Sequence, residues 1–69
     1  MLAYVNAKAK ILEYIKQNGL QAGDRLPTEV DLSERLQIGR LSLREGLNAL
    51  KTEGIIVSMQ GRGTFVACN

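Results

Sequence analysis

The stretch from Gly39 to Glu53 constrains the fold more than any other part of the chain. Because a helix advances about 100° per residue, its apolar positions fall on one side. These positions are Leu43, Gly46, Leu47 and Leu50. A second side collects the cationic and amide positions Arg40, Arg44, Asn48 and Lys51. The pattern predicts a helix over about 40–53 with a buried face and a basic exposed face. An amphipathic surface helix whose charges serve only to keep the protein soluble shows the same pattern.

Two further helical patterns precede this stretch. In residues 3–18 the apolar positions Tyr4, Ala7, Ile11 and Ile15 recur at helical spacing, and Leu12 and Tyr14 widen the stripe. The two tyrosines share the apolar side, which is more typical of core and flank residues than of base-stacking platforms. Glycine often adopts the left-handed conformation that ends a helix, so Asn18-Gly19 predicts its end.

The second helix is predicted between Thr28 and about Leu36. Residues 20–27 form a loop with one short strand, because Pro27 keeps the preceding residue extended. Thr28 has the chemistry of an N-cap. Leu32 and Leu36 are one turn apart and predict the core contacts. Residues 37–39 leave room only for a tight turn, with Ile38 as an apolar plug, so the order is helix, turn, helix.

A β-hairpin with a glycine-rich tip is predicted after Gly54. Residues 55–59 and 64–67 are apolar and partly β-branched, and they flank Gln60-Gly61-Arg62-Gly63. Alternation would send Ile56 and Phe65 inward, although the face that each residue takes depends on the strand register, which the sequence leaves open. The two glycines can simply supply the positive φ of a turn. Alternatively, Arg62 at the tip of a hairpin can reach a minor groove or its phosphates.

Composition narrows the class of protein. Sixty-nine residues allow one domain, and 45% hydrophobic with 23% charged residues describes a folded soluble chain. No apolar run spans a bilayer and the start lacks the pattern of a signal peptide, so we expect a cytoplasmic protein. The net charge is +2, and its positive excess lies in the second half. That excess favours an anionic partner.

The residues argue against an enzyme. The chain has no histidine and one cysteine, Cys68, which excludes a disulfide within the chain and leaves no ligand set for zinc. Cys68 is interpreted as an inert terminal thiol. The seven carboxylates fall where helix caps or solvated faces would put them, and no nucleophile is paired with a base. We expect no cofactor and no catalytic site.

The predicted fold is α+β: a winged helix-turn-helix of three helices followed by a two-stranded antiparallel wing. Local strings narrow the family. Gly-Asp-Arg-Leu-Pro-Thr-Glu at 23–29, Leu-Arg-Glu-Gly-Leu at 43–47 and Gly-Arg-Gly-Thr-Phe-Val at 61–66, with Leu50 and Glu53-Gly54-Ile55 between them, resemble the DNA-binding domain of GntR-family bacterial transcription regulators. Each string is weak alone, but their combination at these separations is specific.

The resemblance implies several things beyond the fold. It implies that residues 1–69 are a DNA-reading domain, joined in the full-length protein to a C-terminal domain that binds a metabolite and dimerises, and that this second domain is absent from the chain. The amino-acid sequence of the wing is most similar to that of the FadR-like group. The expected partner is double-stranded DNA with a palindromic operator, and the isolated chain is expected to be a monomer or weak dimer.

The family's DNA contacts, carried over by position, fall at the start of the third helix and in the wing. They are Arg40, Leu41, Ser42, Arg44, Gln60, Gly61 and Arg62. Weaker candidates are Thr28, Gly39, Asn48, Lys51 and Gly63. Helical periodicity independently selects the arginines at 40 and 44, each of which suits guanine O6 and N7 or a phosphate.

Four positions depart from the family's pattern. Gly39 replaces Ser or Thr and removes a side-chain cap, which costs a few tenths of a kcal/mol. Val30 stands where an arginine is common, so a contact from the start of the second helix to a DNA phosphate or base is expected to be missing. Leu41 replaces a small polar residue and favours contact with a thymine methyl. Gly46 replaces alanine at a cost of about 1 kcal/mol, which predicts a close crossing with the first or second helix.

Two functions of different classes follow. The first is sequence-specific binding of duplex DNA, with the helix at about 40–53 in the major groove and the tip at 61–63 at the minor groove. The second is a protein-docking module of the same fold, with Leu41 and Met59 as apolar anchors. Binding to random duplex DNA, and its salt dependence, separates the two.

Overall fold

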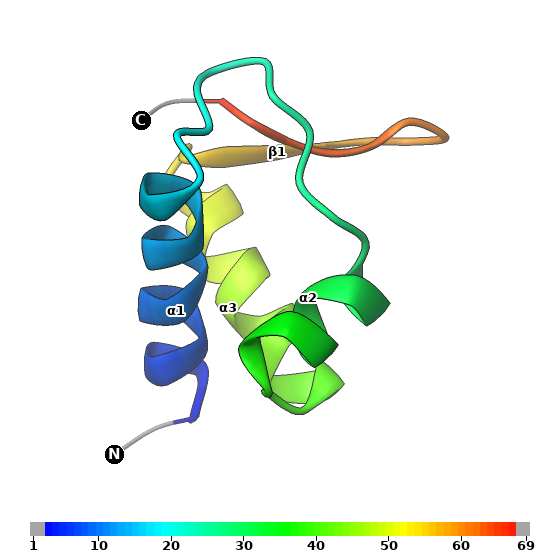
Figure 1. Cartoon of the computed structure of the whole chain (residues 1–69). Coiled ribbons are helices and arrows are strands. Elements are labelled where there is room, and N and C mark those ends of the chain that lie inside the picture. Colours follow the sequence, from blue (N-terminus) through cyan, green and yellow to red (C-terminus); the bar gives the residue numbers. More distant parts are fainter. Residues whose placement is uncertain (1–2, 68–69) are drawn as a thin grey trace.

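A computed structural model describes residues 3–67 of the chain, as three helices followed by a two-stranded sheet. The helices are α1 (Ala3–Gln17), α2 (Glu29–Leu36) and α3 (Arg40–Thr52), and the strands are β1 (Ile56–Met59) and β2 (Gly63–Val66). The strands and the loop between them, residues 56–66, project from the helices as a wing (Figure 1). The predicted winged helix-turn-helix is confirmed, and α3 ends one residue earlier than predicted because Glu53 is its C-cap.

One face of each helix and one side of the sheet enclose the core. Its buried members are Ala7, Ile11, Ile15, Leu26, Leu32, Leu43, Leu47, Leu50, Ile56 and Val66. Tyr14, Leu36 and Ile38 pack against this core from its edge, as the sequence predicted. The side chain of Tyr4 and all of Cys68 lie outside the described residues. The core positions of α1 and α3 match the predicted apolar stripes.

The antiparallel register of the wing decides which side chains face the helices. Ile56 pairs with Val66, and Val57 pairs with Phe65. Paired residues share a face and successive residues alternate, so Ile56 and Val66 point into the core while Val57 and Phe65 point outward. The prediction for Ile56 is confirmed, but that for Phe65 is wrong. Alternation defines two faces without saying which one is buried, and the pairing places Val66 on the inner face.

The loop before α2 forms a short third segment alongside β2. The amide of Leu26 donates to Thr64 O at 2.8 Å, and the amide of Val66 donates to Asp24 O at 2.8 Å. Between these bonds, Arg25 forms an isolated antiparallel bridge with Phe65. Residues 20–27 therefore contain a single bridge residue in place of the short strand expected there, and this pairing ties the chain leading into α2 to β2.

Gly46 lies where α3 crosses α1. A Cβ at this position would lie 3.0 Å from Ala7 Cβ and 3.0 Å from the backbone nitrogen of Lys8. That spacing is tighter than ordinary van der Waals contact, so a side chain at this position would require the first helix to shift. The predicted close crossing is confirmed, and its partner is the first helix.

Candidate nucleic-acid interface

The turn between α2 and α3 sets the direction of α3. Gln37 adopts a left-handed conformation with φ 54° and caps the end of α2. The hydroxyl of Ser33 donates to Ile38 O at 2.6 Å, and the amide of Ile38 donates back to Ser33 O at 3.1 Å. These reciprocal bonds and the partial burial of Ile38 hold the turn, so the first residues of α3 start from a fixed position.

Gly39 is the N-cap of α3 and forms no side-chain cap. Its extended backbone, with φ −60° and ψ 147°, lets its carbonyl accept from the amide of Leu43 at 2.9 Å. The other amides of the first turn carry no side-chain partner from this position. This matches the sequence expectation for Gly39, and it leaves positive amide ends at the start of a helix whose next residue is Arg40.

The buried and exposed faces of α3 separate as predicted. Arg40, Leu41, Arg44, Asn48 and Lys51 are exposed, opposite the leucines that enter the core. Leu41 is 73% exposed, an unusual position for a leucine. Ser42 is half-buried and lies about 160° around the helix from both arginines, beyond Leu41 at the edge of the exposed face. The structure therefore brings Arg40, Leu41 and Arg44 to one side and places Ser42 on the flank.

Arg44 is held by a carboxylate from α2. Its Nη2 lies 3.2 Å from Glu29 Oε1, and the side chains remain 57% and 39% exposed. An exposed pair of this kind contributes between zero and about 1 kcal/mol, so it directs the guanidinium more than it stabilises the fold. Arg44 is thus oriented at the surface rather than buried against the carboxylate.

Sequence reasoning missed the Glu29–Arg44 pair. Glu29 lies in the first turn of α2, where its charge also suits the positive end of the helix dipole. The two residues are 15 positions apart and meet because α2 packs against α3. No local pattern in the sequence signals a contact of this kind.

The tip of the wing exposes three of the predicted residues, Gln60, Gly61 and Arg62. The amide of Arg62 donates to Met59 O at 2.9 Å and closes the turn. Gly61 and Gly63 have φ of 78° and 118°, so both use a conformation that other residues rarely adopt. Both glycines therefore serve the turn, and they also place Arg62 at its end.

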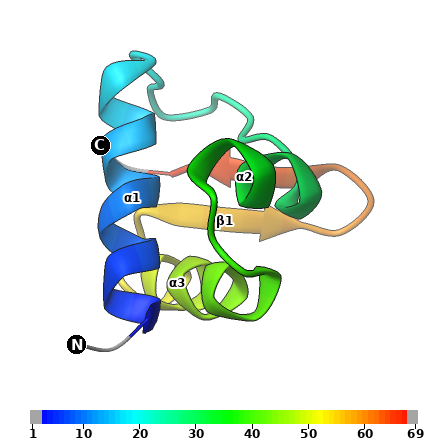
Figure 2. The same ribbon diagram turned by 60° about the horizontal axis from the view of Figure 1, so that its bottom comes forward.

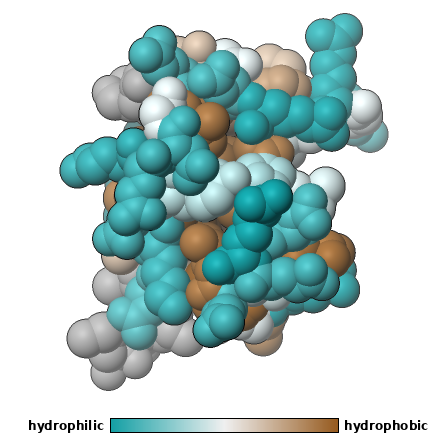
Figure 3. Space-filling view, in the orientation of Figure 1, coloured by the Kyte–Doolittle hydropathy of each residue, from teal (hydrophilic) through white to brown (hydrophobic). Residues whose placement is uncertain are grey.

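The start of α3 and the wing tip lie on the same side of the molecule. In the two views of the ribbon, both point away from α1 (Figures 1 and 2). Hydrophilic side chains cover the region of the wing tip, and hydrophobic patches appear lower down, toward α2 and the start of α3 (Figure 3). Val30 and Leu41 are 47% and 73% exposed. This side therefore combines cations with isolated apolar side chains.

The weaker candidates for DNA contacts lie in different environments. Thr28 is the N-cap of α2, because its hydroxyl accepts from the amide of Asp31 at 3.2 Å. Asn48 and Lys51 are exposed on the basic face, and Gly39 is exposed at the start of α3. Gly63 is half-buried. Only Asn48 and Lys51 add polar side chains to the face that carries the arginines.

Ion pairs within residues 3–67 neutralise this side only in part. Glu53 pairs with Lys8 of α1, and Glu29 pairs with Arg44. In the same part of the chain, no salt bridge involves Arg40, Lys51 or Arg62. The side that carries the start of α3 and the wing tip consequently has a local excess of positive charge.

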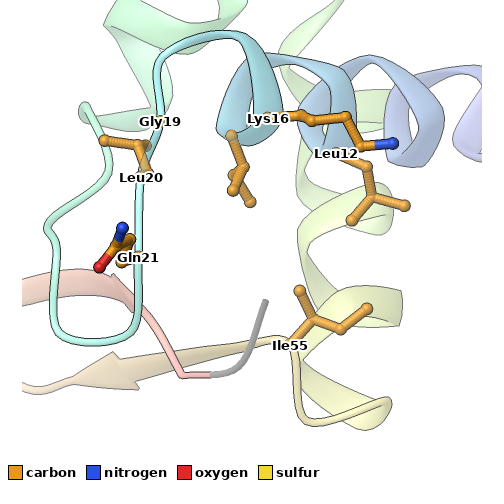
Figure 4. Close-up of a pocket in the computed structure, with 7 residues that line it drawn as sticks. Leu12, Lys16, Gly19, Leu20, Gln21 and Ile55 are labelled. Atoms are coloured by element: carbon orange, nitrogen blue, oxygen red, sulfur yellow. The ribbon is translucent and has the colours of Figure 1, made fainter.

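A hollow of about 450 Å³ lies elsewhere, between the end of α1 and the start of β1. Leu12, Leu20 and Ile55 give it an apolar lining, and Lys16 lies at its edge (Figure 4). In the described part of the chain, no three His, Cys, Asp or Glu side chains come together as metal ligands. None of the helices in residues 3–67 is both long and apolar enough to cross a membrane.

Comparisons with known proteins agree with this geometry. The family described as "Bacterial regulatory proteins, gntR family" matches residues 3–66. The chain is 34% identical over 65 residues to a probable fructoselysine utilization operon transcriptional repressor of Escherichia coli, covering 94% of this chain and 27% of that protein. It therefore spans about a quarter of the length of that relative.

Solved structures show the same fold. A GntR protein of Streptococcus agalactiae superposes with a TM-score of 0.88 at 31% identity, covering 93% of this chain and 31% of that one. The AraR DNA-binding domain, crystallised in complex with an operator, superposes with a TM-score of 0.82 at 34% identity, covering 97% and 82%. Since the family match extends over nearly the whole chain, this protein belongs to the gntR family of bacterial regulatory proteins.

Proposed function

We propose that this chain is the double-stranded DNA-binding domain of a bacterial transcription regulator, with α3 in the major groove and residues 61–63 at the minor groove. The observation that carries the proposal is the positive surface of α3 and the wing, where Arg40, Lys51 and Arg62 are exposed without salt bridges among the described residues. The operator complexes of the AraR domain support it by likeness of fold. Such a protein works in the cytoplasm, beside the chromosome.

The residues divide by the kind of contact they suit. A guanidinium on α3 can bind guanine O6 and N7 with two hydrogen bonds, whereas an exposed leucine suits a thymine methyl. Arg40, Leu41 and Arg44 are therefore proposed as base readers. Gln60, Gly61 and Arg62 are proposed as contacts to the minor groove and its phosphates, and Ser42 as a contact from the flank of the helix.

The full-length regulator is proposed to contain a further domain that binds a metabolite and pairs two copies on a palindromic operator. The length of the Escherichia coli relative, of which the chain spans 27%, supports a longer protein. Two linked domains on two half-sites gain affinity through effective concentration. Sedimentation of this chain alone at micromolar concentration should show a monomer, and a tight dimer would contradict this view. The FadR-like assignment remains a prediction.

Titration with random-sequence duplex DNA at several salt concentrations tests the central proposal. We expect binding that weakens steeply with salt, with a log-log slope of about −3 to −5, because one domain displaces counterions from roughly three to five phosphates. A docking module would show no such binding, and its exposed Leu41 and Met59 would then be the surfaces to investigate. Salt-independent or absent binding would reject the DNA-binding function.

A further inference from the structure

Arg25 lies against the wing, although it comes from the loop before α2. A Cβ at Gly63 would lie 2.9 Å from Nε of Arg25, 3.2 Å from Nη2 and 3.4 Å from Cζ. The guanidinium group therefore lies over the backbone of Gly63, in space that a side chain would otherwise occupy. Gly63 serves two purposes here, since its φ of 118° also suits only glycine.

The backbone of Arg25 is fixed on both sides. Val66 donates to the preceding carbonyl of Asp24, and the following amide of Leu26 donates to Thr64, each at 2.8 Å. Leu26 is 3% exposed and anchors the segment in the core. These contacts fix the backbone of Arg25 beside Phe65, while the residue itself stays exposed.

The register places Arg25 on the outer face of the wing. Arg25 is bridged to Phe65, and Gly63 lies two residues before Phe65, on the same face of β2. This face points away from the core that receives Ile56 and Val66. Arg25 is exposed, and no salt bridge involves it within residues 3–67. Its charge lies next to the residue that follows Arg62.

We propose that Arg25 is a phosphate contact of the wing, which rests on the DNA-binding function proposed above. A wing that enters a minor groove has a sugar-phosphate strand on each side of it. Arg62 extends from the tip, and Arg25 on the outer face meets the strand farther from α3. A guanidinium held over glycine binds phosphate oxygens in any sequence, so Arg25 adds affinity and no base preference.

The test compares two variants that each remove one positive charge. Arg25→Gln keeps a polar but shorter and uncharged side chain at the wing, and Lys16→Gln changes the exposed lysine at the end of α1, on the side away from the wing tip (Figures 1 and 4). Binding to random-sequence duplex DNA is measured against salt. We expect Arg25→Gln to lower the magnitude of the salt slope by about 1 and the affinity roughly three- to tenfold. Lys16→Gln should stay close to the unmodified chain.

Two further outcomes keep the proposal falsifiable. Arg25→Lys retains the charge and should recover the salt slope, and thermal unfolding checks that all variants are folded. Equal slopes for Arg25→Gln and Lys16→Gln would overturn the contact, as would a folded Arg25→Lys that behaves like Arg25→Gln. If the unmodified chain itself bound no DNA, the function proposed above would fail first, which separates the two proposals.

Discussion

The exposed surface of α3 and the wing both present cations, but the two regions hold them by different means. The arginines of α3 project from a helix whose other face is buried through Leu43, Leu47 and Leu50. The wing has no helix behind its tip, and backbone hydrogen bonds to the 23–26 segment and between the strands hold it. Side-chain packing therefore fixes α3 along its length, whereas the wing is packed into the core through Ile56 and Val66 and is extended toward its tip by main-chain pairing.

The charges in the two regions differ in the same way. Arg44 is oriented by Glu29, which limits the directions in which it can bind. Arg62 has no salt bridge among the described residues, and Arg25 lies over a glycine rather than beside a carboxylate. A guanidinium that projects from a packed helix suits recognition of base edges in the major groove, whereas one at the wing suits phosphates. The comparison predicts that α3 selects the sequence and that the wing supplies general affinity.

The largest effect should come from disturbing the packing that holds α3. Gly46→Val places branched methyl groups where even a Cβ would lie 3.0 Å from Ala7 and Lys8. We expect a loss of about 2–3 kcal/mol in the free energy of unfolding, because overpacking forces the two helices apart. Urea unfolding measures it. Asn48→Val is the control, since it adds the same side chain on the exposed face of α3. Equal losses would show that the crossing is not tight.

The division between reading and general affinity is tested by Arg40→Ala and Arg62→Ala. Arg40→Ala should weaken binding to the preferred sequence by about 1–3 kcal/mol and relax the preference at one base pair. Arg62→Ala should weaken binding to all sequences alike and lower the salt slope by about 1. Selection from a random DNA pool, with affinity measured at two salt concentrations, separates the effects. Reversed roles would contradict the comparison.

A smaller effect is expected at the carboxylate that holds Arg44. Glu29→Gln removes a negative charge near the side proposed to face DNA and releases Arg44. Affinity for random duplex DNA should rise roughly two- to fivefold at low salt, and the gain should shrink as salt screens the charges. Filter binding at two ionic strengths measures it. If affinity for random DNA did not rise, the negative charge of Glu29 would not be opposing the approach of phosphates.

The smallest effect concerns the uncapped start of α3. Gly39→Ser supplies the hydroxyl acceptor that the helix lacks, and we expect a gain of a few tenths of a kcal/mol in stability. Thermal unfolding of the purified chain is sensitive enough to detect it. The same change at Gly61 is the contrast, because φ of 78° disfavours a side chain there. A loss of stability from Gly39→Ser would mean that the hydroxyl cannot reach a free amide.

The sequence predicted local features well and tertiary contacts poorly. Periodicity located the three helices, and Thr28, Gly39 and Gly46 behave as their residue types predicted. Phe65 was misplaced because alternation leaves the choice of face to strand pairing. Contacts such as the one between Glu29 and Arg44 join residues far apart in the chain, and no repeat or motif in the sequence predicts them. The predicted DNA contacts, by contrast, stay predictions until binding is measured.

The bonds between the 23–26 segment and β2 have a mechanical consequence. Pro27 and Thr28 alone separate this segment from α2, whose first residue holds Arg44. The wing cannot swing without pulling on the start of α2, and α2 rests against α3. If α3 and the wing bind as proposed, this linkage predicts that a duplex whose grooves are spaced differently from these two elements has to deform to accommodate both.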